Sequence, residues 1–439
     1  MNVTPVVLRS LAVLLVSVLW CRPVSASWDL WEVYRLALLN DPAYRSEQLR
    51  HDAVSLDGPI AEAAWHGSVS VAGRLGYRMT DDTPHNNWED HEDHLLELRA
   101  EVPVYDRVLR TEVHQSEAAQ SASAMLLRQS HQQLILRVAQ RYLDVLAAQD
   151  RREVARVDII AIRRQLDLTS ERLEVGLGTQ ADLFDARARL KQAEANAIQA
   201  DNLHKVSISL LGQVIGQPPQ ALAPLLGDAP LSAPQPALID EWTAQAATSN
   251  LDVRTKTLEL KVAEFEVKKL QDATYPRVTA GGSRSVTVGK VGSKTSDAAS
   301  VYLQVSIPVF TGGLSLRSER AGIEYNRAHE ALDHARRQAL AETTTAYLDV
   351  TGNISQVEAL REAITAGESA LSAKQEGFNA GLTTNLDVLD AQRNLSQSRT
   401  DYLNARYSYI LSLLALEQAI GDLDQSDIQR VNQWLDRES

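Results

Sequence analysis

The sequence repeats itself over most of its length, and this duplication constrains the fold more than any other feature. The tetrapeptide Tyr-Leu-Asp-Val at residues 142–145 returns at 347–350. The segment ERLEVGLGTQADLFDA at 171–186 returns as EGFNAGLTTNLDVLDA at 376–391. Both pairs lie 205 residues apart. A constant interval indicates that one structural unit occurs twice in tandem.

A proline-rich segment separates the two copies. Residues 217–237 read QPPQALAPLLGDAPLSAPQPA, a composition that ends helices and predicts a connector. We therefore expect a first repeat over residues 27–216 and a second repeat over residues 238–421. A C-terminal tail over residues 422–439 then completes the chain.

The N-terminus has the features of an export signal. A basic start precedes the apolar run at residues 11–20, and small residues ending at Ala26 offer a cleavage site. We therefore expect residues 1–26 to be removed, and with them Cys21, the only cysteine of the chain. The residue before Cys21 is Trp20, where a lipoprotein would carry a small residue, and this disfavours acylation of Cys21.

Charge and motif content argue against several function classes. The formal net charge is −13, so the chain lacks the basic surface that nucleic-acid binding requires. No nucleophile elbow, phosphate-binding loop or dinucleotide-binding fingerprint is present in the sequence. We therefore expect neither an enzyme nor a bound cofactor, and no nucleic-acid partner.

Four segments alternate apolar and polar residues, as β-strands with two different faces do. These segments are about 67–79, 94–105, 276–289 and 300–310. A half-buried sheet in a soluble domain gives the same alternation, but these segments are long enough to cross a bilayer when tilted. An aromatic residue marks the inner end of each segment, as in an interfacial girdle. The girdle residues are Trp65, Tyr105, Tyr275 and Phe310.

Long helical segments follow the strands. Residues 108–173 contain no proline or glycine, which predicts about 100 Å of continuous helix. Residues 314–378 form the counterpart in the second repeat, and shorter helices are expected at about 180–214 and 384–420. The heptad-like spacing fits an ordinary coiled coil as well as a helical barrel, and periodicity does not separate the two.

Four strands per chain cannot close a membrane barrel, because the smallest such barrels have about eight strands. An open sheet edge in lipid would leave backbone groups without hydrogen-bond partners. If the strands cross a membrane, several chains must therefore share one barrel. Two chains would supply about eight strands, and three would supply about twelve, enough to leave a lumen.

Together these features resemble the outer-membrane efflux protein family, the TolC-like channels. The resemblance covers essentially the whole mature chain, from ALLNDPAY at 37–44 through both YLDV segments, IPVFTGG at 307–313 and both tip phrases. It implies a mostly α-helical fold with membrane β-strands. Three chains would form one twelve-stranded outer-membrane barrel, surrounded by lipid and continued by a periplasmic helical barrel. The connector and the C-terminal tail would form an equatorial collar around it.

The resemblance also implies a function. Such channels are passive export ducts of tripartite efflux or type I secretion systems. They act as homotrimers with a periplasmic adaptor and an inner-membrane transporter, and drugs, metals and proteins are all possible cargo. A periplasmic coiled-coil adaptor without a pore is the alternative, although it would not need two strand pairs with aromatic ends.

The repeated tip phrases place acidic residues near the start of a helix. Thr179 precedes Asp182 by three residues, and Thr384 precedes Asp387 in the same way, as in a capping box. Capping and a role in function explain Asp182 and Asp185 equally well. Capping explains less of Asp390, which lies in the second helical turn.

The resemblance gives these acids a second interpretation, a gate at the periplasmic tip. Two aspartate rings would fall on Asp387 and Asp390, where three copies of each would attract cations and raise one another's pKa. In the family an arginine and a tyrosine hold the closed state, whereas Thr383 and Phe378 occupy those positions here. Packing around Phe378 is then expected to contribute to closure. The candidate gate residues are Asp182, Asp185, Phe378, Thr383, Asp387 and Asp390.

The resemblance places the adaptor contact at the two turns between helices. Glycine permits a tight turn at each of them, and a leucine follows that would be exposed without a partner. Two ordinary hairpin turns would give the same pattern. The candidate adaptor-contacting residues are Gly176, Leu177, Thr179, Gly381, Leu382 and Thr384.

A histidine-rich segment, HNNWEDHEDH at residues 85–94, is the remaining candidate site. His91 and His94 could ligate a metal, but the segment defines no third and fourth ligands. We therefore predict no metal site, and we expect this segment to form the solvated outer loop of the first hairpin.

Overall fold

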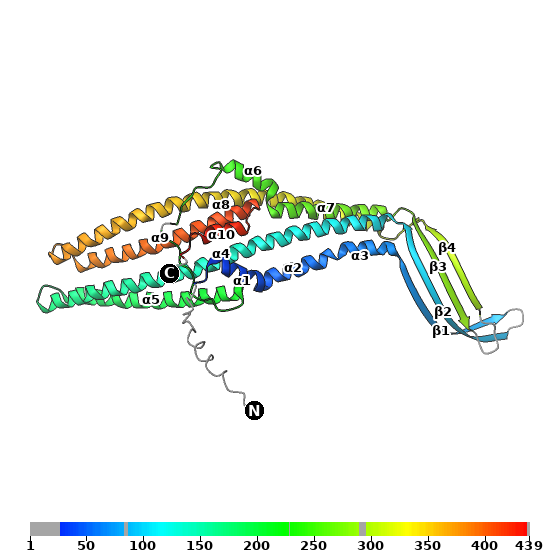
Figure 1. Ribbon diagram of the computed structural model, residues 1–439, viewed down its shortest axis with the longest axis horizontal. Helices are drawn as coiled ribbons and strands as arrows, with labels where there is room; N and C mark the ends of the chain where they lie inside the picture. Colours follow the sequence, from blue (N-terminus) through cyan, green and yellow to red (C-terminus); the bar gives the residue numbers. More distant parts are fainter. Residues whose placement is uncertain (1–26, 83–86, 228, 289–295, 437–439) are drawn as a thin grey trace, which may run out of the picture.

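A computed structural model of the protein describes residues 27–82, 87–227, 229–288 and 296–436. The expected export signal lies outside these residues. The molecule is an elongated rod with a β-sheet at one end and two helical hairpins that reach the other end (Figure 1).

The sheet has four antiparallel strands in the order β1-β2-β3-β4. The strands are β1 (Ser68–Asp82), β2 (Asn87–Tyr105), β3 (Arg277–Val288) and β4 (Ser296–Ser306). Each repeat contributes one hairpin, and β2 pairs with β3 to join the two repeats. Within the described chain, β1 and β4 have a neighbour on one side only, so both are open edges.

β2 extends further at its outer end than the sequence analysis predicted. It begins at Asn87, so residues 87–94 belong to the strand and not to an outer loop. The prediction was wrong because the sequence of this segment lacks the apolar–polar alternation by which the other strands were recognised, and a strand that continues beyond the bilayer does not need it. Within the described ranges, no three histidine, cysteine or acidic residues are grouped so that they could hold a metal ion.

β4 is shifted by a few residues from its predicted position. It starts at Ser296 and ends at Ser306 rather than near residue 310. Pro308 follows, and its missing N–H prevents further pairing. β2 instead continues past its own proline, Pro103, through a register irregularity.

The two faces of the sheet differ in polarity. On one face the cross-strand neighbours Val71 and Leu98 are both exposed in the protomer. On the other face Glu101, Gly281 and Tyr302 form one cross-strand row, and Tyr302 Oη donates a hydrogen bond to Glu101 at 2.6 Å. One apolar face and one polar face are typical of strands in a membrane barrel with an aqueous interior.

Arg284 interrupts the apolar face, and the structure supplies the reason. Its guanidinium donates two hydrogen bonds to the carboxylate of Asp297 on β4, at 2.8 and 3.2 Å. A bidentate ion pair of this kind lowers the cost of a charge on the apolar face. The sequence analysis missed the pair because Asp297 lies outside the strand predicted over residues 300–310.

Two long helical hairpins make up most of the rod. The first joins α4 (Arg107–Glu174) to α5 (Gln180–Ile215), and the second joins α8 (Leu314–Asn379) to α9 (Asn385–Ile420). α4 and α8 span 68 and 66 residues, while α5 and α9 span 36 residues each. None of the helices in the described ranges is both long and apolar enough to cross a membrane.

Shorter helices lie beside the long ones (Figure 1). They are α1 (Leu30–Asn40), α2 (Pro42–Ser55), α3 (Asp57–Ala63), α6 (Ile239–Ser249), α7 (Leu251–Asp272) and α10 (Gln425–Asn432), with a 3₁₀ turn η1 (Ala64–His66) before β1. α2 and α3 pack on α4, and α7 packs against both α4 and α8. The helices near the sheet therefore follow one another in the order α3, α4, α7, α8.

The main apolar core lies midway along the rod. Tyr34, Tyr142, Leu143 and Ile410 are almost fully buried there. The buried hydroxyl of Tyr142 donates to the carbonyl of Ala223 at 2.7 Å, which anchors the connector on this core. The connector also touches the C-terminal tail, through a bridge between Leu225 and Leu435.

Candidate gate and docking site at the hairpin tips

Each hairpin ends in a glycine turn of the same design. Gly176 and Gly381 have φ angles of 77° and 76°, in the left-handed region that favours glycine. The N–H of the next residue, Leu177 or Leu382, donates to the carbonyl five residues upstream, at 2.8 and 2.7 Å. This bond satisfies a helix-terminal carbonyl, as in a Schellman motif. The two leucines are 71% and 83% exposed and form the extreme end of each hairpin.

Both tips continue into a helix through a complete capping box. The backbone N–H of Asp182 donates to Thr179 Oγ1 at 3.1 Å, and the N–H of Thr179 donates back to the Asp182 carboxylate at 3.2 Å. Thr384 and Asp387 repeat this arrangement at 3.2 and 3.1 Å. The carboxylates of Asp182 and Asp387 therefore help to start α5 and α9.

The acids of the second tip also have cationic neighbours within the protomer. Asp387 lies 3.7 Å from Lys374 Nζ, and Asp390 lies 2.9 Å from Arg189 on α5. The hydrogen bonds from Thr384 lower the pKa of Asp387, in the direction opposite to the mutual repulsion expected in a trimeric throat. Asp185 is exposed and lines a small pocket beside Arg189.

A buried polar cluster joins the two hairpins just above the tips. Asn385, which is 1% exposed, accepts hydrogen bonds from Gln165 at 2.8 Å and from Thr169 at 3.2 Å on α4. Its amide nitrogen donates to the carbonyl of Asp182 at 3.1 Å. One side chain of α9 therefore holds both helices of the first hairpin.

A second contact between the hairpins involves Arg172 of α4. Its guanidinium lies 4.6 Å from the ring centre of Phe378 and donates to the carbonyl of Phe378 at 2.7 Å. Phe378 is only 7% exposed. Thr383 does not bridge the hairpins, because its hydroxyl donates within its own hairpin to the carbonyl of Lys374 at 2.9 Å.

Sequence reasoning missed most of the residues that connect the hairpins. These residues are Gln165, Thr169, Arg172, Arg189 and Asn385. Position-by-position comparison of the repeats contains a signal for one of them, because Arg172 has Gly377 as its counterpart. A large cationic side chain in one repeat, at a position where the other repeat has glycine, indicates an interaction that only one of the two tips makes.

The four girdle aromatics lie where the sheet meets the helices. Trp65 is in η1, Tyr105 ends β2, Tyr275 precedes β3 and Phe310 follows β4. The guanidinium of Arg107 lies 3.8 Å from the ring centre of Tyr275, and Phe310 is 89% exposed. Aromatic rings with an apolar body and a polar end are enriched at bilayer interfaces, and the girdle formed by these four residues stays a prediction.

Relatives of this chain align with it over nearly its whole length. The chain is 28% identical to the outer membrane protein TolC of Vibrio cholerae, over 94% of this chain and 95% of that protein. It is 26% identical to the alkaline protease secretion protein AprF of Pseudomonas aeruginosa, over 92% and 86% of the two chains.

Solved structures share its fold. A membrane protein from Pseudomonas aeruginosa aligns with a TM-score of 0.79 and 19% identity, covering 92% of this chain and 97% of that one. The outer membrane protein VceC of Vibrio cholerae aligns with a TM-score of 0.77 and 19% identity, over 89% and 96% of the two chains.

The family model described as "outer membrane efflux protein" matches residues 33–217 and 242–422, which together make up most of the sequence. This match does not favour the alternative of a pore-free adaptor, and the family is one of channels rather than of enzymes. The chain therefore belongs to the outer membrane efflux protein family and is a TolC-like protein of the bacterial outer membrane.

Proposed function

We propose that three copies of this chain form a passive outer-membrane duct, with an inner-membrane transporter supplying the energy and a periplasmic adaptor joining the two. The observation that carries the proposal is the open four-stranded sheet. It has one apolar face and two free edges, and such edges need partner strands in lipid. Three copies would complete a barrel of about twelve strands with a water-filled lumen.

Exposed apolar side chains support a ring-shaped assembly. Leu49 in α2, Leu56 in the turn between α2 and α3, and Ile60 in α3 are 68%, 58% and 66% exposed. Leu316 and Ile323 on α8 are 69% and 62% exposed. These two surfaces lie at opposite ends of the helix order α3, α4, α7, α8. A head-to-tail contact between them would close a ring and bury both.

The hairpin tips are the proposed gate and docking surface of this duct. Asn385 and Arg172 hold the hairpins together in the protomer, so they resist the outward movement that opening requires. Rings of Asp387 and Asp390 would line the throat and favour cations. The exposed Leu177 and Leu382 would contact the adaptor.

The experiment that tests the proposal is a planar-bilayer recording of the detergent-purified mature protein. We expect a trimer that conducts ions with a preference for cations. Asp387→Asn and Asp390→Asn should both weaken this preference, whereas Asp401→Asn, further along α9, should not. Unchanged ion preference in both tip variants would contradict the gate assignment. A water-soluble monomer would contradict the duct itself.

A further inference from the structure

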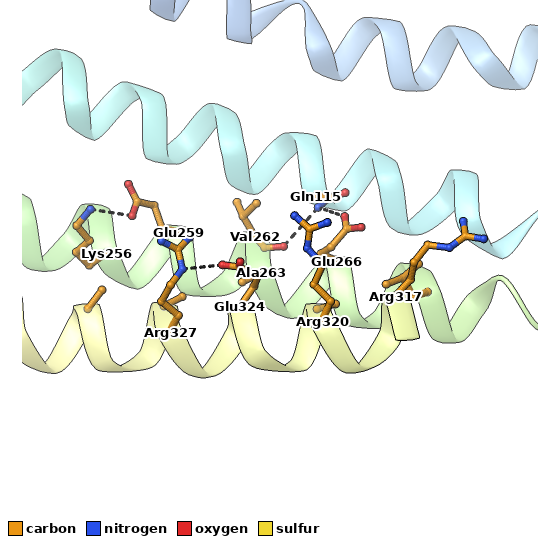
Figure 2. Close-up of a pocket in the computed structure, with 14 residues that line it drawn as sticks. Gln115, Lys256, Glu259, Val262, Ala263, Glu266, Arg317, Arg320, Glu324 and Arg327 are labelled. Atoms are coloured by element: carbon orange, nitrogen blue, oxygen red, sulfur yellow. Dashed lines mark hydrogen bonds and ion pairs between the residues drawn. The ribbon is translucent and has the colours of Figure 1, made fainter. Parts of the chain in front are cut away.

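A groove runs between α7 and α8 close to the sheet, far from the hairpin tips. Its volume is about 600 Å³, and Gln115 of α4 also reaches it. Figure 2 shows side chains of α7 and α8 converging on this groove. Small apolar residues, including Ala321 and Ala328 on α8, line part of its wall.

The charges along the groove are not balanced. Lys256 is paired with Glu259 at 2.9 Å, and Arg327 with Glu324 at 2.6 Å, as the dashed lines in Figure 2 mark. The third acid, Glu266, is 2.6 Å from Lys269 and accepts a hydrogen bond from Gln115 at 2.9 Å.

Among the described residues, two arginines of the groove have no acidic partner. Arg317 donates there only to the carbonyl of Gly312, at 3.2 Å, and Arg320 makes no hydrogen bond or ion pair with any described residue. Both side chains are exposed in the protomer. They are three residues apart, so they lie one helical turn apart on the same side of α8. Two guanidinium groups at this spacing can bind the oxygens of one anion together.

The position of these arginines is electrostatically unfavourable for the helix itself. They lie in the first two turns of α8, and the helix dipole disfavours cations in the first of these turns. The first repeat also begins its long helix with two arginines, Arg107 and Arg110, but Arg107 is paired with Asp272 at 3.0 Å. The counterparts of Arg317 and Arg320 themselves are Glu112 and Gln115. The positive charge at positions 317 and 320 therefore has no equivalent in the first repeat, and it does not serve helix stability.

We propose that Arg317 and Arg320 form an oxyanion site that binds the phosphate or carboxylate groups of a ligand in this groove. Two kinds of molecule carry such groups, an acidic solute in the duct and a membrane phospholipid whose headgroup lies at the nearby bilayer surface. In the first case the site selects acidic cargo, and this case rests on the proposed duct. In the second case the site anchors the helices beneath the barrel.

Calorimetric titration of the detergent-purified full-length trimer with sodium pyrophosphate at low ionic strength tests the site. We expect Arg317→Gln/Arg320→Gln to weaken binding by about tenfold or more, because two charge-assisted contacts are lost. Arg336→Gln is the matched control, since Arg336 is on the same helix but is paired with Asp333 and does not line the groove. Equal affinity of the wild type and the double variant would overturn the proposal.

Two further measurements identify the source of the ligand. If it is a solute in the duct, pyrophosphate should reduce the single-channel current of the wild type but not that of the double variant. If it is a lipid, phosphatidylglycerol should co-purify from nanodiscs with the wild type and be lost from the double variant. The proposal is overturned if neither effect is observed. Currents recorded without pyrophosphate show whether the duct itself conducts, so they separate this outcome from failure of the proposed duct. The variant Arg317→Lys/Arg320→Lys keeps the charge and shows whether the fold tolerates substitution at these positions.

Discussion

Asn385 shows how one buried side chain can set the position of two helical hairpins. It satisfies Gln165 and Thr169 on α4 and the carbonyl of Asp182 on α5. The cluster is not fully satisfied, because the side-chain oxygen of Gln165 is buried without a hydrogen-bond partner. A buried network with one unmet acceptor is held less tightly than a complete one, which suits its role in the proposed gate, where this contact would break when the tips separate.

Asn385→Ala should therefore loosen the tips. The substitution leaves the buried side-chain amide of Gln165 without its acceptor, at a cost of about 1–3 kcal/mol, whereas the Thr169 hydroxyl keeps the carbonyl of Gln165 at 2.7 Å. We expect a higher resting conductance in planar bilayers, with the trimer intact. Asn394→Ala, at an exposed position of the same helix, is the control. A resting conductance equal to that of the wild type would show that Asn385 does not restrain the gate.

A hydrogen bond between Tyr407 and Asp150, in the middle of the rod, gives a prediction about pH. Tyr407 Oη donates to Asp150 at 2.5 Å, and burial raises the pKa of Asp150 while this hydrogen bond lowers it. Tyr407→Phe should raise that pKa further and leave the carboxylate unsatisfied. An acid whose folded pKa lies above its unfolded value loses stability as the pH rises through the folded pKa.

The Tyr407→Phe variant should consequently be less stable than the wild type by about 1–3 kcal/mol at pH 7. The difference should shrink as the pH falls and Asp150 is protonated, because its pKa is raised. Denaturant titration of the detergent-solubilised protein at pH 7 and at pH 5 measures it. Tyr325→Phe, which removes a hydroxyl with no partner among the described residues, should have little effect at either pH. A pH-independent loss would mean that Asp150 is not the group involved.

At the level of elements, the long helices and the glycine turns were predictable because local signals determine them. An absence of proline and glycine, repeated threonine caps and a constant interval of 205 residues define α4, α5, α8 and α9 within one or two residues. The ends of β2 and β4 were predicted less well, because strand ends depend on pairing with distant segments. The ion pair of Arg284 with Asp297 and the cluster around Asn385 were missed for the same reason, since their partners are remote in sequence.

The role of Gly281 in the sheet becomes clear only from its cross-strand neighbour, Tyr302. A Cβ atom at Gly281 would lie 2.5 Å from the ring of Tyr302, which extends over this position to reach Glu101. Gly281→Ala should therefore displace Tyr302 and break its hydrogen bond. We expect a trimer that dissociates at lower temperature in semi-native gel electrophoresis. Gly73→Ala, in β1, is a matched control because nothing lies within 4 Å of its added Cβ. Equal losses in the two variants would refute this role of Tyr302.

For the whole molecule, the apolar surface falls into regions with different proposed partners. The sheet face would contact lipid, the surfaces on α2, α3 and α8 would contact neighbouring copies, and the tip leucines would contact an adaptor. Monomeric soluble proteins rarely expose large apolar patches. The exposure is therefore consistent with a chain that is complete only as part of an assembly. Single charged substitutions can test the subunit contact and the tips separately, because these two regions lie far apart along the rod (Figure 1).

Leu316→Asp and Leu177→Asp place the same charge at two leucines of similar exposure, 69% and 71%. Leu316→Asp should prevent trimer formation, because it places a charged carboxylate in the proposed apolar subunit contact, where removal from water is costly. Leu177→Asp should leave the trimer and its conductance intact but abolish crosslinking of the tip to the adaptor in cells. Native mass spectrometry and a photo-crosslinker placed at Leu382 read out the two effects. If Leu177→Asp also caused the trimer to dissociate, or if Leu316→Asp left the trimer intact, the assignment of these surfaces to different partners would be wrong.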